Sequence, residues 1–225
     1  MNHISELAQL GTSTWLDDLS RERLVSGNLK EIISTKSIVG VTTNPAIFAA
    51  AMTNGTAYDA ELATLKESKA SADEAVYALA IEDVQNACDL FADIYSSTDG
   101  ADGRVSIEVD PRISDDPTAT LEQARELWSK VDRPNVMIKI PATTGSLPAI
   151  EDALAEGISV NVTLIFSVER YRAVIEAFRT GLKRAAESGK DVATIHSVAS
   201  FFVSRLDTEV DKRLEAIGSC LLYTS

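Results

Sequence analysis

The sequence predicts an α/β fold in which short strands alternate with helices, and two observations favour a (β/α)8 or TIM barrel over an open sheet. Polar side chains alternate with apolar ones toward the carboxyl ends of several strands, as the mouth of such a barrel requires. No Gly-x-Gly-x-x-Gly motif follows the first strand, which argues against a dinucleotide-binding sheet. Only six strand patterns are found, so we expect an incomplete barrel with about six of the eight strand–helix units.

Six runs rich in β-branched residues are the predicted strands, and amphipathic stretches separate them. The strands are expected at Thr14–Asp17, Ile38–Thr43, Arg104–Asp110, Val136–Ile140, Ser159–Phe166 and Ala193–Val198. Because no linker interrupts this alternation, residues 1–219 are predicted to form one barrel domain.

Signals in the sequence also mark the helices between these strands. Asp116 followed by Pro117 predicts one helix start, and two further helices are expected after Ser167 and after Ser200. The segment 45–95 is long enough for two or three helices, with breaks at 54–55 and 69–71.

The composition excludes several classes of protein. The chain has 225 residues, 45% hydrophobic and 24% charged, and a formal net charge of −13. An acidic chain without a basic cluster is not expected to bind nucleic acid or an anionic membrane surface. No stretch has the length and apolar character of a membrane span, and Met1–Ser20 lacks the pattern of an export signal. Cys88 and Cys220 match neither a disulfide framework nor a metal-ligand spacing, so a cytoplasmic protein without a metal is predicted.

Lys139 is the most informative residue, because it stands between Ile138 and Ile140 in a strand predicted to be buried. Burial disfavours the protonated ammonium, and a neutral amine attacks carbonyl carbons to form a Schiff base. Such an intermediate accepts electrons when a carbon–carbon bond breaks. Two alternatives stay open: a strand-end lysine whose amine reaches solvent, and a static ion pair with a carboxylate such as Glu108.

Two carboxylates and two neutral polar residues are predicted to accompany this lysine. Asp17 and Glu108 come at the ends of two strands, where a carboxylate near an amine can accept and return protons. Asn161 and Thr163 alternate with apolar residues in another strand and can hydrogen-bond hydroxyl groups or a catalytic water. The alternatives are an N-cap for Asp17, a salt bridge for Glu108, and hydrogen bonds to neighbouring backbone for Asn161 and Thr163.

Two further positions suit a ligand. Thr42-Thr43-Asn44-Pro45 ends a strand with hydrogen-bonding groups, although an ordinary turn explains the same residues. Arg205 lies in the first turns of the helix expected after Ser200, where backbone N–H groups and a guanidinium together favour a phosphate. An ion pair of Arg205 with Asp207 or Glu209 is the alternative.

Taken together, these motifs resemble the transaldolase family. The resemblance rests on Trp15-Leu16-Asp17, Gly40-Val41-Thr42-Thr43-Asn44-Pro45, Glu108-Val109-Asp110, Ile138-Lys139-Ile140-Pro141-Ala142-Thr143, Asn161-Val162-Thr163-Leu164-Ile165-Phe166-Ser167 and Ser200–Asp207. Their order and spacing agree with the family from residue 1 to about residue 219. The long insertion after Pro45 resembles the long-chain bacterial transaldolases rather than the shorter fructose-6-phosphate aldolases.

The resemblance implies a Schiff-base transferase of the pentose phosphate pathway. Such an enzyme moves a dihydroxyacetone unit from sedoheptulose 7-phosphate to glyceraldehyde 3-phosphate, which yields erythrose 4-phosphate and fructose 6-phosphate, with no cofactor or metal. By resemblance, Lys139 is the amine nucleophile and Asp17 is the base in C–C cleavage. Glu108 and Thr163 hold the water that carries protons during imine formation. The implied substrate-binding residues are Asn44, Asn161, Ser200 and Arg205.

The resemblance also carries departures and alternatives. No residues match the serine and arginine that the family places on a seventh strand, and residues 220–225 look like a non-native tail, so we expect a C-terminally truncated chain. The expected partners are small sugar phosphates, and the expected assembly is a monomer or homodimer. An aldolase (lyase) that releases dihydroxyacetone from fructose 6-phosphate, or a catalytically silent fragment that binds phosphosugars, is the alternative function.

Overall fold

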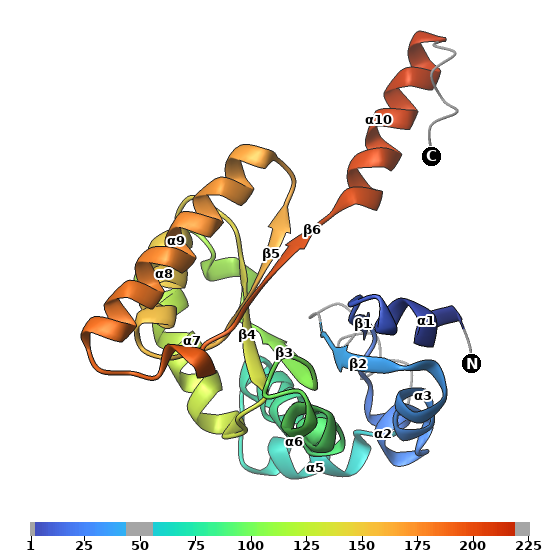
Figure 1. Cartoon of the computed structure of the whole chain (residues 1–225). Coiled ribbons are helices and arrows are strands. Elements are labelled where there is room, and N and C mark those ends of the chain that lie inside the picture. The colour runs from blue at the N-terminus through green and yellow to red at the C-terminus, as the bar shows by residue number, and fades with distance from the viewer. Residues whose placement is uncertain (1–2, 44–55, 219–225) are drawn as a thin grey trace.

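The computed structural model describes residues 3–43 and 56–218, in which six parallel strands form one curled sheet (Figure 1). The strands are β1 (Thr14–Leu16), β2 (Ile38–Val41), β3 (Arg104–Glu108), β4 (Val136–Pro141), β5 (Val160–Ile165) and β6 (Ser197–Phe201). Each strand pairs with the next one along the chain. This order, with helices between the strands, is that of a (β/α)8 barrel, so the predicted fold class is confirmed as a half-barrel of six strands.

Helices follow most of the strands and cover one face of the sheet. They are α1 (His3–Gln9), α2 (Arg21–Val25), α3 (Asn28–Lys36), α5 (Asp59–Glu67), α6 (Ala72–Ser97), α7 (Pro117–Val131), α8 (Leu147–Ala155), α9 (Val168–Glu187) and α10 (Val203–Ile217). The core lies between these helices and the sheet. Ile107, Ile138 and Val162 from the strands pack in it with Phe91 and Leu127 from the helices. The aliphatic residues of each strand therefore face the helices, and the alternating polar residues face the other side.

The helix starts follow from the capping residues that the sequence contains. The Asp116 carboxylate accepts hydrogen bonds from the first backbone N–H groups of α7, and the Ser167 hydroxyl accepts one from Arg170 at the start of α9. In the segment 45–95, α5 and α6 are separated at residues 68–71, and Ser71 forms a capping box with Glu74. The break predicted at 54–55 and the tail predicted at 220–225 lie outside the described residues.

The sixth strand is displaced from its predicted position. It was expected at Ala193–Val198 and lies at Ser197–Phe201. The Asp191 carboxylate accepts a hydrogen bond from the backbone N–H of Ala193 and starts a 3₁₀ turn, so pairing with β5 begins only at Ser197. As a result Ser200 is part of the strand. Strand β6 leads into α10, which extends away from the other helices (Figure 1).

None of the helices in the described part of the chain combines the length and the apolar character needed to cross a membrane.

Candidate active site

The alternation of β3 brings its polar residues to the face of the sheet that the helices leave uncovered. Ser106 and Glu108 share this face, and Glu108 lies in register with Lys139 of β4. On the other side of β4, Lys139 lies in register with Asn161 of β5. Neighbouring strands thus bring together a lysine, a carboxylate and an amide that are far apart in the sequence.

The amine of Lys139 has two acceptors and little access to solvent. Its Nζ atom donates to the carbonyl oxygen of Thr43 at 2.9 Å and lies 3.4 Å from Oε2 of Glu108. The lysine side chain is 8% exposed, so the alternative of an amine in solvent is wrong. The contact with Glu108 exists, but it is longer than the roughly 2.7–2.9 Å of a tight charge-assisted hydrogen bond. Lys139 therefore lies beside the carboxylate without being clamped to it.

Glu108 lies in an environment that favours its neutral form. Burial raises the pKa of its carboxyl, and nearby Asp17 raises it further, while the Lys139 ammonium acts in the opposite direction. The N-cap alternative for Asp17 is wrong, because Ser20 caps α2 by accepting from the N–H of Arg23. Asp17 thus directly follows β1 and does not cap the next helix.

A chain of hydrogen bonds joins three strands beside the lysine. The Ser200 hydroxyl donates to Oδ1 of Asn161 at 2.9 Å, and Nδ2 of Asn161 donates to the Ser106 hydroxyl at 3.0 Å. The Thr43 hydroxyl donates to the Ser106 carbonyl at 2.9 Å. Sequence reasoning gave Ser106 no role of its own, and it considered Thr43 only as part of the Thr42-Thr43-Asn44-Pro45 segment. The signal for Ser106 was its alternation with Glu108, whereas nothing in the sequence marks the Thr43 carbonyl.

Thr163 has an unsatisfied hydroxyl. Its Oγ1 atom is buried and has no hydrogen-bond partner among the described residues. Thr163 lies within the irregular stretch of the pairing between β5 and β6, and the next residue, Leu164, has a φ of 60°. A buried hydroxyl without a partner costs about 1–3 kcal/mol. A water or a substrate atom bound here would remove that cost.

The remaining two predicted site residues form none of the contacts described so far. Asn44 lies outside the described residues. Arg205 lies in the first turn of α10, and its guanidinium carbon is 4.6 Å from the centroid of the Phe202 ring. Glu209, an expected ion-pair partner of Arg205, pairs with Arg213 instead. Within the described chain Arg205 makes no ion pair with a carboxylate, so its guanidinium is available to an anion.

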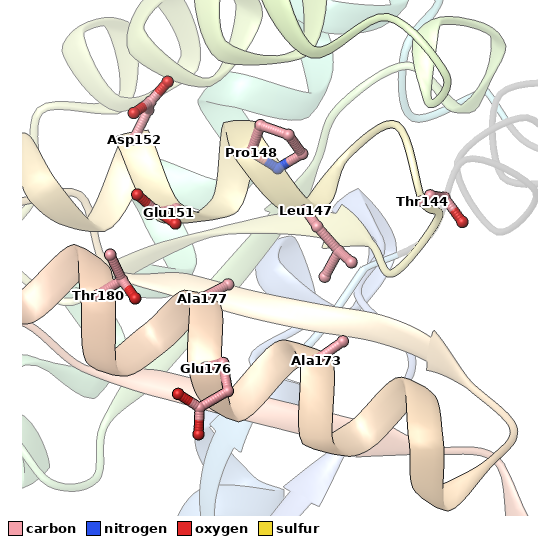
Figure 2. Close-up of a pocket in the computed structure, with 9 residues that line it drawn as sticks. All are labelled: Thr144, Leu147, Pro148, Glu151, Asp152, Ala173, Glu176, Ala177 and Thr180. Atoms are coloured by element: carbon pink, nitrogen blue, oxygen red, sulfur yellow. The ribbon is translucent and has the colours of Figure 1, made fainter.

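A groove of about 490 Å³ lies elsewhere, between α8 and α9 (Figure 2). It is lined by Thr144, Leu147, Pro148, Glu151, Asp152, Ala173, Glu176, Ala177 and Thr180. None of the predicted site residues lines it, so the groove is separate from the candidate active site. The described residues contain no group of three or more His, Cys, Asp or Glu side chains suited to a metal ion.

Comparisons with known proteins identify the family of the chain. Residues 14–223 match the family described as "Transaldolase/Fructose-6-phosphate aldolase". A protein named transaldolase from Kocuria rhizophila is 60% identical over 214 residues, which are 95% of this chain and 58% of that protein. Proteins of the same name from Mycolicibacterium smegmatis and Mycobacterium ulcerans are 59% and 58% identical over 217 residues, which are 96% of this chain. The chain spans 58% of the length of each of these relatives. The chain belongs to the transaldolase/fructose-6-phosphate aldolase family.

Proposed function

We propose that the chain carries the Schiff-base centre of a transaldolase-type transferase. The proposed reaction moves a dihydroxyacetone unit from sedoheptulose 7-phosphate to glyceraldehyde 3-phosphate and gives erythrose 4-phosphate and fructose 6-phosphate. The observation that supports it most directly is the buried amine of Lys139, which lies between the Thr43 carbonyl and the Glu108 carboxylate. An amine held in this way is suited to attack a ketone.

The proposed chemistry starts with attack of the neutral Lys139 nitrogen on C2 of the ketose. The carbinolamine that forms loses its oxygen as water, with proton transfers through a water held by Glu108 and Thr163, to give an iminium ion. Asp17 then takes the proton of the C4 hydroxyl, and the electrons of the C3–C4 bond move into the iminium. The aldose leaves, and an enamine stays on Lys139. This step needs no metal or cofactor, because the iminium accepts the electron pair.

The second half of the proposed reaction runs the same steps in reverse. The enamine attacks the carbonyl carbon of the acceptor aldehyde, Asp17 returns its proton to the new hydroxyl, and water releases the ketose. Glu108 suits proton transfer in both directions, because burial and Asp17 raise the pKa of its carboxyl above the ordinary value. The unsatisfied hydroxyl of Thr163 supports a bound water at this position.

The proposed substrate contacts use the polar groups around the lysine. Asn161 and Ser200 would hold the hydroxyls of the dihydroxyacetone unit, since they already bond to each other beside Lys139. Asn44 is proposed for the same task. Arg205 would bind the phosphate, because it lies in the first turn of a helix and has no carboxylate partner in the described chain.

The proposal also includes the cellular setting. Sugar phosphates are the proposed ligands, and the protein is proposed to be a monomer or homodimer in the cytoplasm. The free, buried thiol of Cys88 is typical of a protein from a reducing compartment.

A product assay tests the proposed function. The purified chain is incubated with fructose 6-phosphate, with and without erythrose 4-phosphate, and the products are identified by mass spectrometry. A transferase forms sedoheptulose 7-phosphate and glyceraldehyde 3-phosphate only when the acceptor is present. Free dihydroxyacetone formed without the acceptor would indicate a lyase, and no product in either mixture would contradict both activities. Lys139→Met is the blank, and exposed Lys190→Met is its matched control.

A further inference from the structure

We infer that Thr43 is a positioning residue that sets the direction from which the Lys139 amine attacks its substrate. The inference rests on the proposed Schiff-base function. Two observations support it. The Nζ atom of Lys139 donates to the backbone carbonyl of Thr43, and the Thr43 hydroxyl donates to the Ser106 carbonyl and so holds Thr43 in place.

The two acceptors around Lys139 have a stereochemical consequence. A neutral primary amine has two hydrogens and one lone pair, arranged roughly tetrahedrally with the carbon atom. If one hydrogen points to the Thr43 carbonyl at 2.9 Å and the other to Glu108 at 3.4 Å, the lone pair has only the remaining direction. In the protonated amine, the third hydrogen occupies that direction instead. The two acceptors thus aim the nucleophile before the substrate arrives.

The Thr43 carbonyl can aim the amine only if it is itself held, and the backbone pairing stops short of it: on the β1 side the last bond runs from the N–H of Thr42 to the Leu16 carbonyl. The last registered pair between β2 and β3 is Val41 with Val105, so Thr43 lies two residues beyond the ladder. The Thr43 hydroxyl donates to the Ser106 carbonyl at 2.9 Å, across the same two strands. Thr43 is 2% exposed, so water does not compete for this bond. The Thr43 hydroxyl therefore connects the chain to β3 beyond the last backbone pair.

The anchor of Thr43 is also connected to the proposed substrate contacts. Ser106, whose carbonyl accepts from Thr43, accepts at its hydroxyl from the amide of Asn161, which in turn accepts from Ser200. Lys139, through Thr43, and the proposed hydroxyl-binding residue Asn161 are thus both hydrogen-bonded to Ser106 of β3. Removing the bond between the Thr43 hydroxyl and Ser106 should therefore change the position of the Lys139 amine more than the proposed substrate contacts.

Three variants test this role. Thr43→Val keeps the shape of the side chain and removes the hydroxyl, Thr43→Ser keeps the hydroxyl, and Thr120→Val is a matched control. Thr120 of α7 is also fully buried, and its hydroxyl donates to the Ile113 carbonyl at 3.0 Å, outside the hydrogen bonds that connect Lys139, Thr43, Ser106 and Asn161. The rate at which borohydride traps fructose 6-phosphate on the chain is measured, together with kcat and KM.

We expect Thr43→Val to lower the trapping rate and kcat about tenfold with little change in KM, as the loss of one buried hydrogen bond would. Thr43→Ser should restore most of the rate, and Thr120→Val should trap as the wild type does. If Thr43→Val does not fold, Thr43→Ala, which removes the hydroxyl without adding volume, is expected to show the same loss.

Three results would overturn the inference. Trapping by Thr43→Val at the wild-type rate would show that the anchor is not needed, and an equal loss in Thr120→Val would show a general effect of destabilisation. An equal loss in Thr43→Ser would show that the hydroxyl is not the cause. Failure of the proposed function gives a different pattern, because the wild-type chain itself would then form no adduct.

Discussion

Lys139 and Arg104 are two buried cations at opposite ends of the same sheet, and their surroundings differ. Lys139 lies in register with the last residue of β3 and contacts a carboxylate and a carbonyl. Arg104 is the first residue of β3 and is 1% exposed. Its Nε atom donates to the Gly100 carbonyl at 2.8 Å, and its guanidinium lies 5.1 Å from the centroid of the Tyr95 ring. Among the described residues it has no ion-pair partner.

Under the proposed function, this difference separates a reactive end of the sheet from a structural one. A guanidinium stays charged in a protein, so Arg104 can fill space and hold neighbours but cannot act as a nucleophile. Burial and the nearby Arg104 charge lower the pKa of His196, which keeps a second positive charge from this end. A lysine can lose its proton, and Lys139 has beside it a carboxylate whose pKa is raised. Barrel enzymes divide their two ends in this way, with chemistry at the carboxyl ends of the strands.

The largest effect should follow removal of the amine at the reactive end. Lys139→Met keeps the length of the side chain, and we expect it to lower the transfer rate by about 10⁴-fold or more, because no other group can form the Schiff base. The measurement is steady-state kinetics with fructose 6-phosphate and erythrose 4-phosphate, after circular dichroism has shown that the variant is folded. Residual activity above a tenth of the wild type would contradict the assignment.

At the structural end the same type of change should act on stability. Arg104→Met removes hydrogen bonds to Gly100 and Ser159 and the contact with the Tyr95 ring, but it also removes a buried charge whose Nη2 atom has no partner in the described chain, so we expect the free energy of unfolding to fall by about 1–3 kcal/mol. Arg125→Met is the control, since Arg125 forms an exposed pair with Glu156 that should contribute less than about 1 kcal/mol. Urea titrations give both values. Equal losses in the two variants would remove the distinction between the ends.

The pH dependence of the reaction tests the environment of Glu108. Desolvation favours the neutral carboxyl, so its pKa lies above the ordinary value of 4.5. Because a protonated carboxyl cannot accept a proton, the transfer rate should fall as the pH falls through this raised pKa. Glu108→Gln should lower the rate at neutral pH by about 10²-fold and remove the acid limb of the profile. A wild-type midpoint at or below 4.5, or an unchanged limb in the variant, would contradict this role.

The reactivity of Cys88 provides a smaller test, of how readily reagents reach the buried residues near Arg104. The Asn135 amide donates to the backbone carbonyls of Cys88 and Gly103 next to Arg104, and Cys88 is 1% exposed. Burial raises the pKa of this thiol. Alkylation of Cys88 by iodoacetamide at pH 8 should therefore be about 100-fold slower in the folded chain than in urea. Peptide mapping measures it, and similar rates in the two conditions would show that this end opens readily.

Much of the fold was predictable from the sequence, because alternation and capping act locally. Five of the six strands lie within a few residues of their predicted positions, and Asp116 and Ser167 mark their helices as expected. The sixth strand was misplaced because Asp191 starts a 3₁₀ turn at Val192–Thr194, where β-branched residues favour a strand. A cap formed with the next two residues outweighed the strand propensity of that run.

The candidate site was predictable in its residue types but not in its contacts. Periodicity put Glu108, Lys139 and Asn161 on strands, and the sheet brings them into register. The Thr43 carbonyl could not be found, because a backbone acceptor has no sequence signal and its partner lies 96 residues away. Ser106 could not be found for the same reason, because the residues that bond to it, Thr43 and Asn161, are far away in the sequence.

Covalent trapping on Lys139 tests the central claim most directly. The folded chain is incubated with fructose 6-phosphate and borohydride, digested, and its peptides are mapped by mass spectrometry. The account predicts a reduced dihydroxyacetone adduct on the peptide that contains Lys139, and none on Lys190 or the other exposed lysines. A cooperatively melting chain that forms no adduct, or forms it on another lysine, would contradict the account.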